Sequence, residues 1–481
     1  MNLLLTTRIL GALLLFLAAA LLLPLPFSFY YDDGAWSAFV LSALICLTVG
    51  GLMFRLIKCR AELSVRDGFA VVTFAWAVFS IFGALPYLLS GAIPSPLDAC
   101  FETMSGFTTT GSTFLTDIES LPKSLHFWRA LTHWLGGMGI IVLSLAILPM
   151  LGVGGMQLFK AEVPGPTADR LKPRIQDTAK LLWGAYVLLT ATETLLLMFG
   201  GMDFFDAICH SFATLATGGF STRNASIAAY DSSYIDAVIT FFMILAGINF
   251  TLHFQILRGR LNDFYRNEEL RCYLAIILFS TLVIMLFNGI EGVYSNLGDN
   301  LRYSVFQVSS IITTTGFGTA DYEGWPVMAQ YILIMLMFVG GCAGSTGGGM
   351  KVVRILLLFK HVQVQVFRLI HPRAVRLVKL GNRPVDKEVL QAILGFFALF
   401  IGIFVAASLL MAACGMDLIS GGAAVIACLA NIGPGLGTVG PVDNFAHIPA
   451  FGKSVLIFCM LMGRLELFTV LVLFFPSFWR K

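Results

Sequence analysis

Long apolar runs are the feature that most constrains the fold of this chain. The sequence has ten of them, each close to the ~20 residues with which a helix crosses the hydrocarbon core of a bilayer. Only 12% of the residues are charged, about half the share found in a soluble domain. The sequence therefore predicts an all-α integral membrane protein, with spanning helices over 8–29, 36–57, 68–91, 127–150, 178–200, 234–257, 273–290, 325–350, 388–412 and 450–476.

Lys and Arg residues gather on one side of these predicted helices. The segments 55–66, 159–180, 258–271 and 351–387 hold 4, 5, 4 and 9 of them, and Arg480 and Lys481 end the chain. The polar segments at the other helix ends hold at most one each: 31–34, 92–125, 201–233, 289–326 and 413–453. The positive-inside rule then places both termini in the cytoplasm. A net charge of +3 is too small to predict nucleic-acid binding.

Four shorter apolar stretches, 98–109, 204–216, 301–314 and 416–431, lie between alternate spans. Each is too short to cross a bilayer and ends in Thr/Gly-rich sequence, which predicts re-entrant helices covered by protein. Alignment of their ends places Gly111, Gly218, Gly316 and Gly433 in register. The chain then divides into two N-terminal helices (1–60) and four pseudo-repeats of helix, pore helix, filter loop and helix (61–155, 156–260, 261–355 and 356–481) around a central pore.

The four glycine loops have the composition of an ion filter. A cation that sheds its water needs replacement oxygens, and the backbone carbonyls of an extended loop can supply them. Glycine suits positions where φ is positive or the backbone must approach closely. The third loop, Thr314–Gly318 (TTGFG), matches the potassium-channel pattern TVGYG at Thr and both Gly residues. One loop encloses nothing, but four loops from one chain can close a ring. Ordinary turns between spans are the alternative, and the fourfold repetition argues against it.

With these loops the sequence resembles the TrkH/TrkG/KtrB superfamily of potassium transporters, and most closely its bacterial TrkH/TrkG branch. The resemblance covers nearly the whole chain, including the two extra N-terminal spans. It implies a potassium-uptake pore subunit that conducts K⁺ through a filter of loop glycines and the carbonyls before them. A Ser in the first loop marks the sodium-selective plant relatives, and this chain has Gly there. The implied filter residues are Thr110, Gly111, Thr217, Gly218, Thr315, Gly316, Ile432 and Gly433.

The resemblance also implies where the protein works and with what. It implies a bacterial inner (plasma) membrane, a homodimer, and a cytoplasmic nucleotide-binding regulatory subunit resembling TrkA. The nine basic residues of 351–387 predict contact with lipid head groups and offer a dock for such a regulator. No cofactor is expected besides the transported K⁺.

The predicted span 325–350 ends in a run that is poorly suited to a helix. Six of the ten residues from 340 to 349 are Gly, and each costs about 0.5–1 kcal/mol relative to Ala in a helix interior. Close helix packing explains one or two of them, but the whole run predicts that the helix unwinds about midway. The resemblance implies an intramembrane gating loop below the filter, formed by Gly340, Gly341, Gly344, Ser345, Thr346, Gly347, Gly348 and Gly349.

Arg464 lies within the apolar span 450–476. A charge at such depth is costly and normally faces a polar partner or a wet cavity. Glu466 is a poor direct partner because residues two apart on a helix do not face each other. A structural pairing with a polar group of another repeat stays open. The resemblance implies that Arg464 projects into the pore below the filter.

Other residues invite alternative functions. His133, His210 and His253 would suit a proton relay, although local hydrogen bonds explain scattered histidines more simply. Arg129 and His133 lie near an outer helix end, where snorkelling would suffice. The nine cysteines lack zinc-site spacing and predict packing roles. A membrane enzyme lacks a nucleophile or paired-carboxylate motif, and a secondary transporter would have inverted repeats, whereas these four share one orientation.

Overall fold

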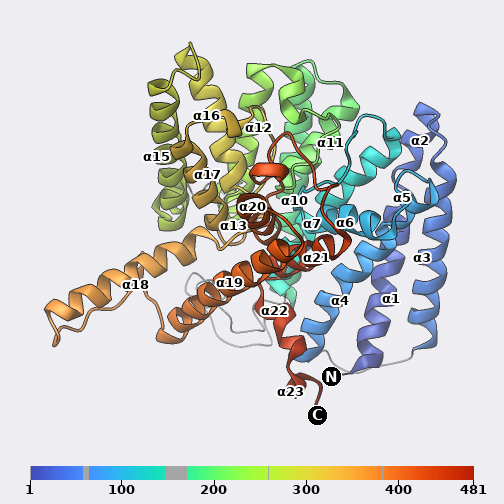
Figure 1. Cartoon of the computed structure of the whole chain (residues 1–481). Coiled ribbons are helices and arrows are strands. Elements are labelled where there is room, and N and C mark those ends of the chain that lie inside the picture. Colours follow the sequence, from blue (N-terminus) through green and yellow to red (C-terminus); the bar gives the residue numbers. More distant parts are fainter. Residues whose placement is uncertain are drawn as a thin grey trace.

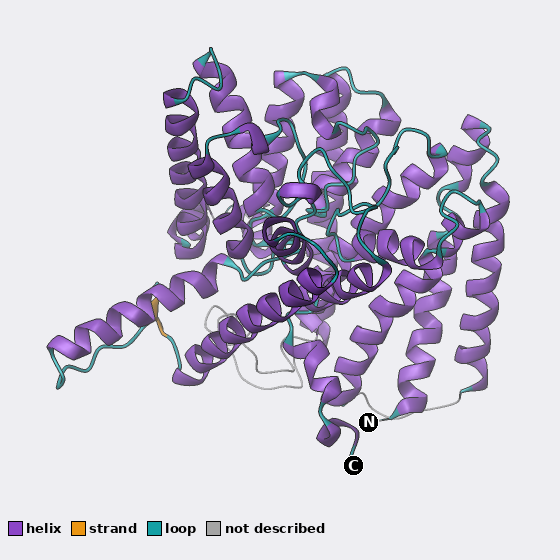
Figure 2. Cartoon of the chain, in the orientation of Figure 1, coloured by secondary structure: helices purple, strands orange, loops and turns teal. Residues whose placement is uncertain are grey.

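The computed structural model describes residues 2–57, 64–146, 171–257, 259, 261–381 and 383–480, and all that follows concerns these residues. The predicted boundaries at 60–61 and 155–156 and the residues 147–150 of the fourth predicted span lie outside them. The same holds for seven of the basic residues counted above: Lys58, Arg60, Lys160, Arg170, Arg258, Arg260 and Lys481. The described chain is mostly helical, with loops between the helices (Figure 2). One short antiparallel ribbon pairs β1 (Lys379–Leu380) with β2 (Arg383–Pro384). The prediction of an all-α membrane protein is confirmed.

The first three helices form a hairpin at one edge of the molecule (Figure 1). They are α1 (Leu3–Ala20), α2 (Leu25–Tyr31) and α3 (Trp36–Leu56). Helices α1 and α3 cross at two glycines, because a Cβ built at Gly11 would lie 2.9 Å from the carbonyl oxygen of Gly50. Such small-residue contacts let helices pack closely in a membrane, where lipid tails are as apolar as the side chains.

The rest of the chain runs four times through a long helix, a short helix, a loop and a further helix. The first passage is α4 (Val65–Gly83), α5 (Leu85–Leu89), α6 (Pro96–Phe107) and α7 (Lys123–Ala146), and the second is α10 (Leu171–Phe199), α11 (Phe204–Leu215), η2 (Ser226–Tyr230), α12 (Ser233–Ala246) and α13 (Phe250–Leu257). Helix α14 (Leu261–Arg266) leads to the third, which is α15 (Glu268–Ile290), α16 (Leu297–Ile312), η3 (Tyr322–Gly324), α17 (Val327–Val339) and α18 (Val352–Ile370). The fourth is α19 (Lys387–Ala413), α20 (Leu418–Leu429), η4 (Gly437–Val439), α21 (Ala450–Arg464), α22 (Phe468–Leu471), η5 (Val472–Phe474) and α23 (Pro476–Trp479).

Three of the ten predicted spans are wrong as continuous helices. By length and composition, the described chain has six helices able to cross a membrane, or up to eight if each bent pair counts as one span. The predicted span 234–257 bends by 103° between α12 and α13, and 450–476 bends by 112° after α21. In the predicted span 325–350 the helix stops at Val339. Each break comes at the end of the first long helix after one of the Thr/Gly-rich loops.

The long helices carry the apolar surface that a lipid bilayer would cover. In α15, the side chains of Leu278, Phe279, Leu282 and Leu286 are each more than half exposed. The short helices are enclosed instead: every residue of α20 from Ala423 to Leu429 is buried. Irregular backbone at membrane depth is tolerated only where protein or a cavity covers it. The enclosed short helices and their loops meet that condition.

Candidate functional site: a ring of four loops and the segment beneath it

The four short helices α6, α11, α16 and α20 end in the same backbone conformation. In each loop, the third residue after the helix donates its N–H to the carbonyl five residues earlier, at 2.8 to 2.9 Å. The second and fourth residues after each helix have positive φ. The four loops therefore share one backbone conformation. Their positive-φ pairs are Thr109 (50°) and Gly111 (81°), Thr217 (55°) and Gly219 (79°), Thr314 (62°) and Gly316 (83°), and Asn431 (56°) and Gly433 (106°).

These loops touch one another in a closed cycle. A Cβ built at Gly111 would lie 2.1 Å from the carbonyl oxygen of Gly218. The same Cβ at Gly219 would lie 2.0 Å from Thr315 O, and at Gly316 it would lie 1.9 Å from Ile432 O. At Gly433 it would lie 2.9 Å from Thr110 O, which closes the fourth loop on the first. Only glycine fits at these four places, because each Cα faces the backbone of the next loop.

The structure corrects the predicted register of the second loop by one residue. Thr110–Gly111, Thr315–Gly316 and Ile432–Gly433 occupy equivalent positions, as the sequence alignment predicts. In the second loop the equivalent pair is Gly218–Gly219, and not the predicted Thr217–Gly218. The alignment failed there because two glycines are adjacent. The aromatic residue after the glycine carries the missing signal, since Phe220 follows Gly219 as Phe317 follows Gly316.

Side chains fix neighbouring loops to each other. Between the fourth and first loops, Asn431 Nδ2 donates to Thr110 Oγ1 at 2.9 Å, and Ser112 Oγ donates to Gly433 O at 3.1 Å. Between the third and fourth loops, the Tyr322 hydroxyl donates to Gly435 O at 2.7 Å. These hydrogen bonds between neighbouring loops help to fix the dimensions of the ring.

A buried ion pair lies behind the first two loops. Arg129 on α7 donates from Nε to Glu102 Oε1 on α6 at 2.8 Å, and the two side chains are 1% and 0% exposed. Glu102 also accepts from Thr113 Oγ1 at 3.0 Å, while Arg129 Nη1 donates to Ser221 O in the second loop at 3.1 Å. The snorkelling predicted for Arg129 and His133 is wrong, because both are buried inside the protein. Glu102 was not singled out from the sequence. Arg129 was the available sign of such a residue, since a buried charge requires a partner.

The glycine run after α17 forms a non-helical segment directly beneath the ring. Gly340 ends α17 with a φ of 79°, and helical structure resumes at Val352. Thr346 Oγ1 donates to Leu215 O at the end of α11 at 3.0 Å, and Gly348 N donates to Thr314 Oγ1 at 2.7 Å. The helix break predicted from this run is confirmed. The segment 340–349 reaches the inner ends of the second and third loops.

Arg464 faces the same segment. It is the last residue of α21, is 2% exposed, and donates from Nη1 to Thr346 O at 2.7 Å. Its Nη2 donates to Gly136 O of α7 at 3.0 Å. Glu466 pairs with Arg354 at the start of α18 instead. Arg464 therefore joins the segment beneath the ring to the first repeat, and its charge is directed at backbone carbonyls.

Local hydrogen bonds account for His210 and His253, whereas both ring nitrogens of His133 are buried without a hydrogen-bond partner among the described residues. His210 meets Asp206 O at 2.7 Å and Ser221 Oγ at 2.9 Å, and His253 Nε2 meets Leu245 O at 2.9 Å. His133 stacks on Phe220, with ring centroids 4.1 Å apart. The described cysteines are free, and no group of three metal-ligating side chains occurs within the described residues.

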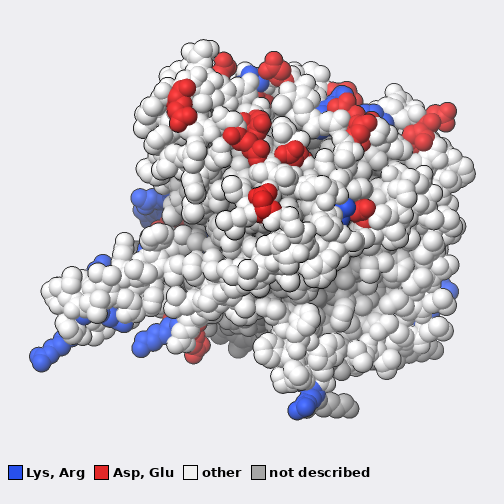
Figure 3. Space-filling model, viewed as in Figure 1, with Lys and Arg blue, Asp and Glu red and all other residues white. Residues whose placement is uncertain are grey.

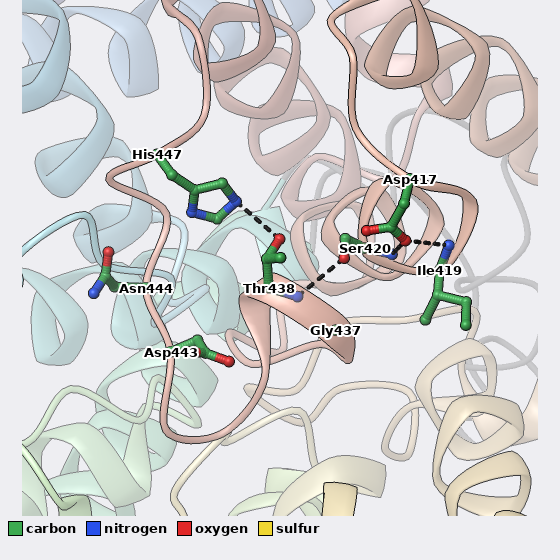
Figure 4. A pocket seen from close by; sticks show the side chains of 8 residues that line it. All are labelled: Asp417, Ile419, Ser420, Gly437, Thr438, Asp443, Asn444 and His447. Atoms are coloured by element: carbon green, nitrogen blue, oxygen red, sulfur yellow. Dashed lines mark hydrogen bonds between the residues drawn. The ribbon is translucent and has the colours of Figure 1, made fainter.

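An open hollow of about 540 Å³ lies beside the fourth loop, between the start of α20 and η4 (Figure 4). Several of its polar side chains already have partners. Asp417 accepts from the backbone N–H groups of Ile419 and Ser420, both at 2.9 Å, and thereby caps α20. Thr438 Oγ1 lies 2.9 Å from His447 Nε2. These bonds fix the course of the chain after the fourth loop.

Spanning helices around enclosed short helices, with four loops meeting in a ring, define a multi-pass membrane protein whose core is built from four quarters of one chain. This chain belongs to the TrkH family of cation transport proteins, whose family model matches residues 36–481. Family membership makes it a transporter and not an enzyme.

Individual relatives match over the full length. The chain is 45% identical over 481 residues to the Trk system potassium uptake protein TrkH of Escherichia coli K12, covering 99% of both. It is 34% identical to the Trk system potassium uptake protein TrkG of the same organism, covering 99% of this chain and 98% of TrkG. The crystal structure of the potassium transporter TrkH from Vibrio parahaemolyticus superposes with a TM-score of 0.92 at 40% identity, covering 100% of both chains.

Proposed function

We propose that this protein takes up potassium ions into the cytoplasm through the ring of four loops. The observation that carries the proposal is the closed cycle in which each loop glycine faces the carbonyl of the next loop. The full-length relatives named as potassium uptake proteins support K⁺ as the cargo.

The filter works by exchanging water oxygens for carbonyl oxygens. A potassium ion that enters the ring loses its hydration shell, and fixed carbonyls at the right spacing offset that cost. The four carbonyls that face a neighbouring glycine belong to equivalent residues, so they form one layer. The filter residues are accordingly Thr110, Gly111, Gly218, Gly219, Thr315, Gly316, Ile432 and Gly433.

The segment 340–349 acts as the gate. It lies against the inner ends of the second and third loops, where an ion leaving the filter would emerge. Arg464 holds it there through Thr346 O and adds a positive charge on the exit path. Opening requires the segment to leave these contacts, and its glycines give it the freedom to adopt a second conformation.

The orientation follows from charge. In Figure 3, acidic side chains lie mostly over the upper part of the face shown, while Lys and Arg mark the projecting arm and the C-terminal end. The positive-inside rule then places the arm and both termini in the cytoplasm of a bacterial cell, with the protein in the inner membrane. Helix α18 projects from the other helices (Figure 1) and offers the dock for a nucleotide-binding subunit resembling TrkA. A homodimer remains part of this proposal.

A secondary transporter with one alternating-access site is the second candidate. The bends after α12 and α21 and the break after α17 favour it, because such transporters use discontinuous helices. The common orientation of the four passages favours a pore instead, since alternating access goes with inverted repeats in many transporters.

The test is ion selectivity in proteoliposomes. Uptake of K⁺, Rb⁺, Na⁺ and Li⁺ is measured for the parent protein and for Gly111→Ser and Gly316→Ser. Both substitutions place a side chain against a carbonyl of the next loop, so the K⁺ preference over Na⁺ should fall by roughly tenfold, as for the loss of ~1.4 kcal/mol.

Gly91→Ser is the matched control, because Gly91 also has positive φ (74°) but nothing lies within 4 Å of its added Cβ. It should keep the parent selectivity. Unchanged selectivity in both loop variants would contradict the filter. If uptake saturates at a rate far below that of channels while both loop variants still lose selectivity, alternating access is favoured.

A further inference from the structure

Gly218 is a glycine that its own backbone does not require. The equivalent residues of the other loops are Thr110, Thr315 and Ile432, so this position accepts β-branched side chains. Gly218 is also absent from the residues with positive φ, unlike its neighbour Gly219. Something outside the second loop must therefore exclude a side chain at 218.

The excluding group is the imidazole of His133. A Cβ built at Gly218 would lie 2.2 Å from His133 Nδ1 and 2.5 Å from its Cγ. His133 belongs to α7, in the first repeat, and is fully buried. Its ring is therefore fixed in the space that the side chains of Thr110, Thr315 and Ile432 fill in their own loops.

The second loop has no side chain of its own to fill that space. In the first loop Thr108 and Thr110 join their hydroxyl oxygens at 2.8 Å, and in the third loop Thr313 and Thr315 do the same. The corresponding residues of the second loop are Ala216 and Gly218.

Helix α7 makes a second contact with this loop. His133 stacks on Phe220 at an interplanar angle of 15°, and the guanidinium of Arg129 lies 4.1 Å from the centre of the same ring. Arg129 also holds Ser221 O. One helix face therefore supports residues 218 to 221 from behind.

We propose that His133 is a positioning residue for the second filter loop: its imidazole replaces the missing side chain at 218 and fixes the carbonyl of Gly218. This inference rests on the proposed filter. Two adjacent glycines are the most flexible pair that a loop can contain, so without the ring behind them this quarter would relax. Loss of the imidazole would leave a cavity beside Gly218. A filter with one relaxed loop discriminates less well between ions of different size.

The first measurement uses His133→Ala. The variant should remain folded, and its preference for K⁺ over Na⁺ should fall several-fold, because one quarter of the ring becomes wider. A packing role unrelated to the filter would lower the melting temperature and leave the selectivity at the parent value, which would overturn the proposal.

The second measurement is a rescue. Gly218→Ala should lose at least about tenfold in K⁺ uptake, because the new Cβ collides with His133. The double variant Gly218→Ala with His133→Ala should recover most of that uptake and selectivity. If the Gly218→Ala protein does not accumulate in the membrane, recovery of folded protein in the double variant counts as the rescue. A double variant no better than Gly218→Ala would overturn the proposal.

Gly219→Ala is the control that separates this inference from the filter itself. Gly219 has a φ of 79°, and its Cβ would lie 2.0 Å from Thr315 O, so His133→Ala should not rescue it. Loss of selectivity in Gly219→Ala without rescue at 218 would overturn the role of His133 and leave the filter in place. Parent selectivity in both Gly218→Ala and Gly219→Ala would contradict the filter.

Discussion

Helix α7 and the interrupted segment from α17 to α18 hold the same place in the first and third repeats but have different structures. Both follow a loop of the ring and pass beneath it. Both bring a glycine against the end of a short helix: a Cβ at Gly136 would lie 1.9 Å from Phe107 O, and one at Gly347 would lie 2.9 Å from Thr313 O. Yet α7 is one helix from Lys123 to Ala146, whereas the third repeat has no helix between Val339 and Val352.

The difference lies in how many glycines there are and what their backbone does. Close contacts at Gly136 and Gly137 are compatible with a regular helix, so α7 passes the ring without a break. In the third repeat Gly340, Gly344, Gly349 and Lys351 all have positive φ, which no α-helix accommodates. Similar glycine contacts thus belong to a continuous helix in one repeat and, in the other, to the non-helical segment that we propose as the gate. Arg464 connects the two, since it binds Gly136 O and Thr346 O.

Removing the obstruction should give the largest effect. Deletion of Gly344 to Gly348 takes away the contacts with Leu215 and Thr314, so K⁺ uptake without any partner subunit should rise by more than about tenfold. Selectivity should stay at the parent value because the ring is intact. Uptake into proteoliposomes, with a melting curve to show folding, checks this. A folded deletion variant that conducts no better than the parent would make this segment as structural as α7.

Cutting the connection between the two regions should have the next largest effect. Arg464→Ala removes two charge-assisted hydrogen bonds, each worth about 1.5–3 kcal/mol, and frees the segment from α7. Uptake should rise by roughly tenfold. Arg464→Lys separates charge from anchoring, because one ammonium cannot reproduce the two-pronged contact. Raised flux in both variants favours anchoring, and raised flux in Ala alone favours the charge. Normal stability with parent flux in both would exclude either role.

A side chain added to α7 should lower the stability of the protein more than it changes ion uptake. Gly136→Ala drives a Cβ into Phe107 O, and overpacking of this kind costs about 1–3 kcal/mol. The melting temperature should drop. Gly184→Ala on α10 is the matched control, since nothing lies within 4 Å of its Cβ, and it should stabilise the helix slightly. Equal melting temperatures for the two variants would argue that α7 does not bear on the ring as closely as described.

The smallest effect should come from one hydroxyl. Thr346→Val keeps the shape of the side chain and removes the hydrogen bond that its hydroxyl shares between Leu215 O at 3.0 Å and Ala246 O at 3.3 Å. A neutral hydrogen bond contributes about 1 kcal/mol, so uptake should rise by only about fivefold. Thr192→Val, whose hydroxyl bonds its own helix at Leu188 O, is the control and should leave uptake unchanged. An effect as large as that of the deletion would mean that the segment rests on this single contact.

The fold was largely predictable from the sequence because membrane-spanning helices are recognised by their length and apolar composition. The break at Gly340 was predictable from six nearby glycines. The bends after Ala246 and Arg464 were not, since only one or two glycines lie near each. There the interruption depends on tertiary contacts, such as Phe250 N donating to Gly344 O at 3.0 Å, which span separate repeats.

The equivalence of the loop residues was predictable to within one residue. Repetition alone aligned three of the four loop pairs as the structure does, while the adjacent glycines at 218 and 219 shifted the alignment of the second loop. What supports the loops was not predictable. His133 lies 85 positions before Gly218 in the chain, and no local pattern relates an imidazole to a glycine in another repeat.

The cyclic contacts have a consequence for how such a ring can evolve. In a pore of four identical chains, every mutation appears four times, so a change tolerated once is rejected if the other three copies cannot bear it. Here each quarter is encoded separately. At equivalent positions the first and third loops have Thr110 and Thr315, the second has Gly218 beside His133, and the fourth has Ile432. Selection can therefore act on one quarter of the ring at a time.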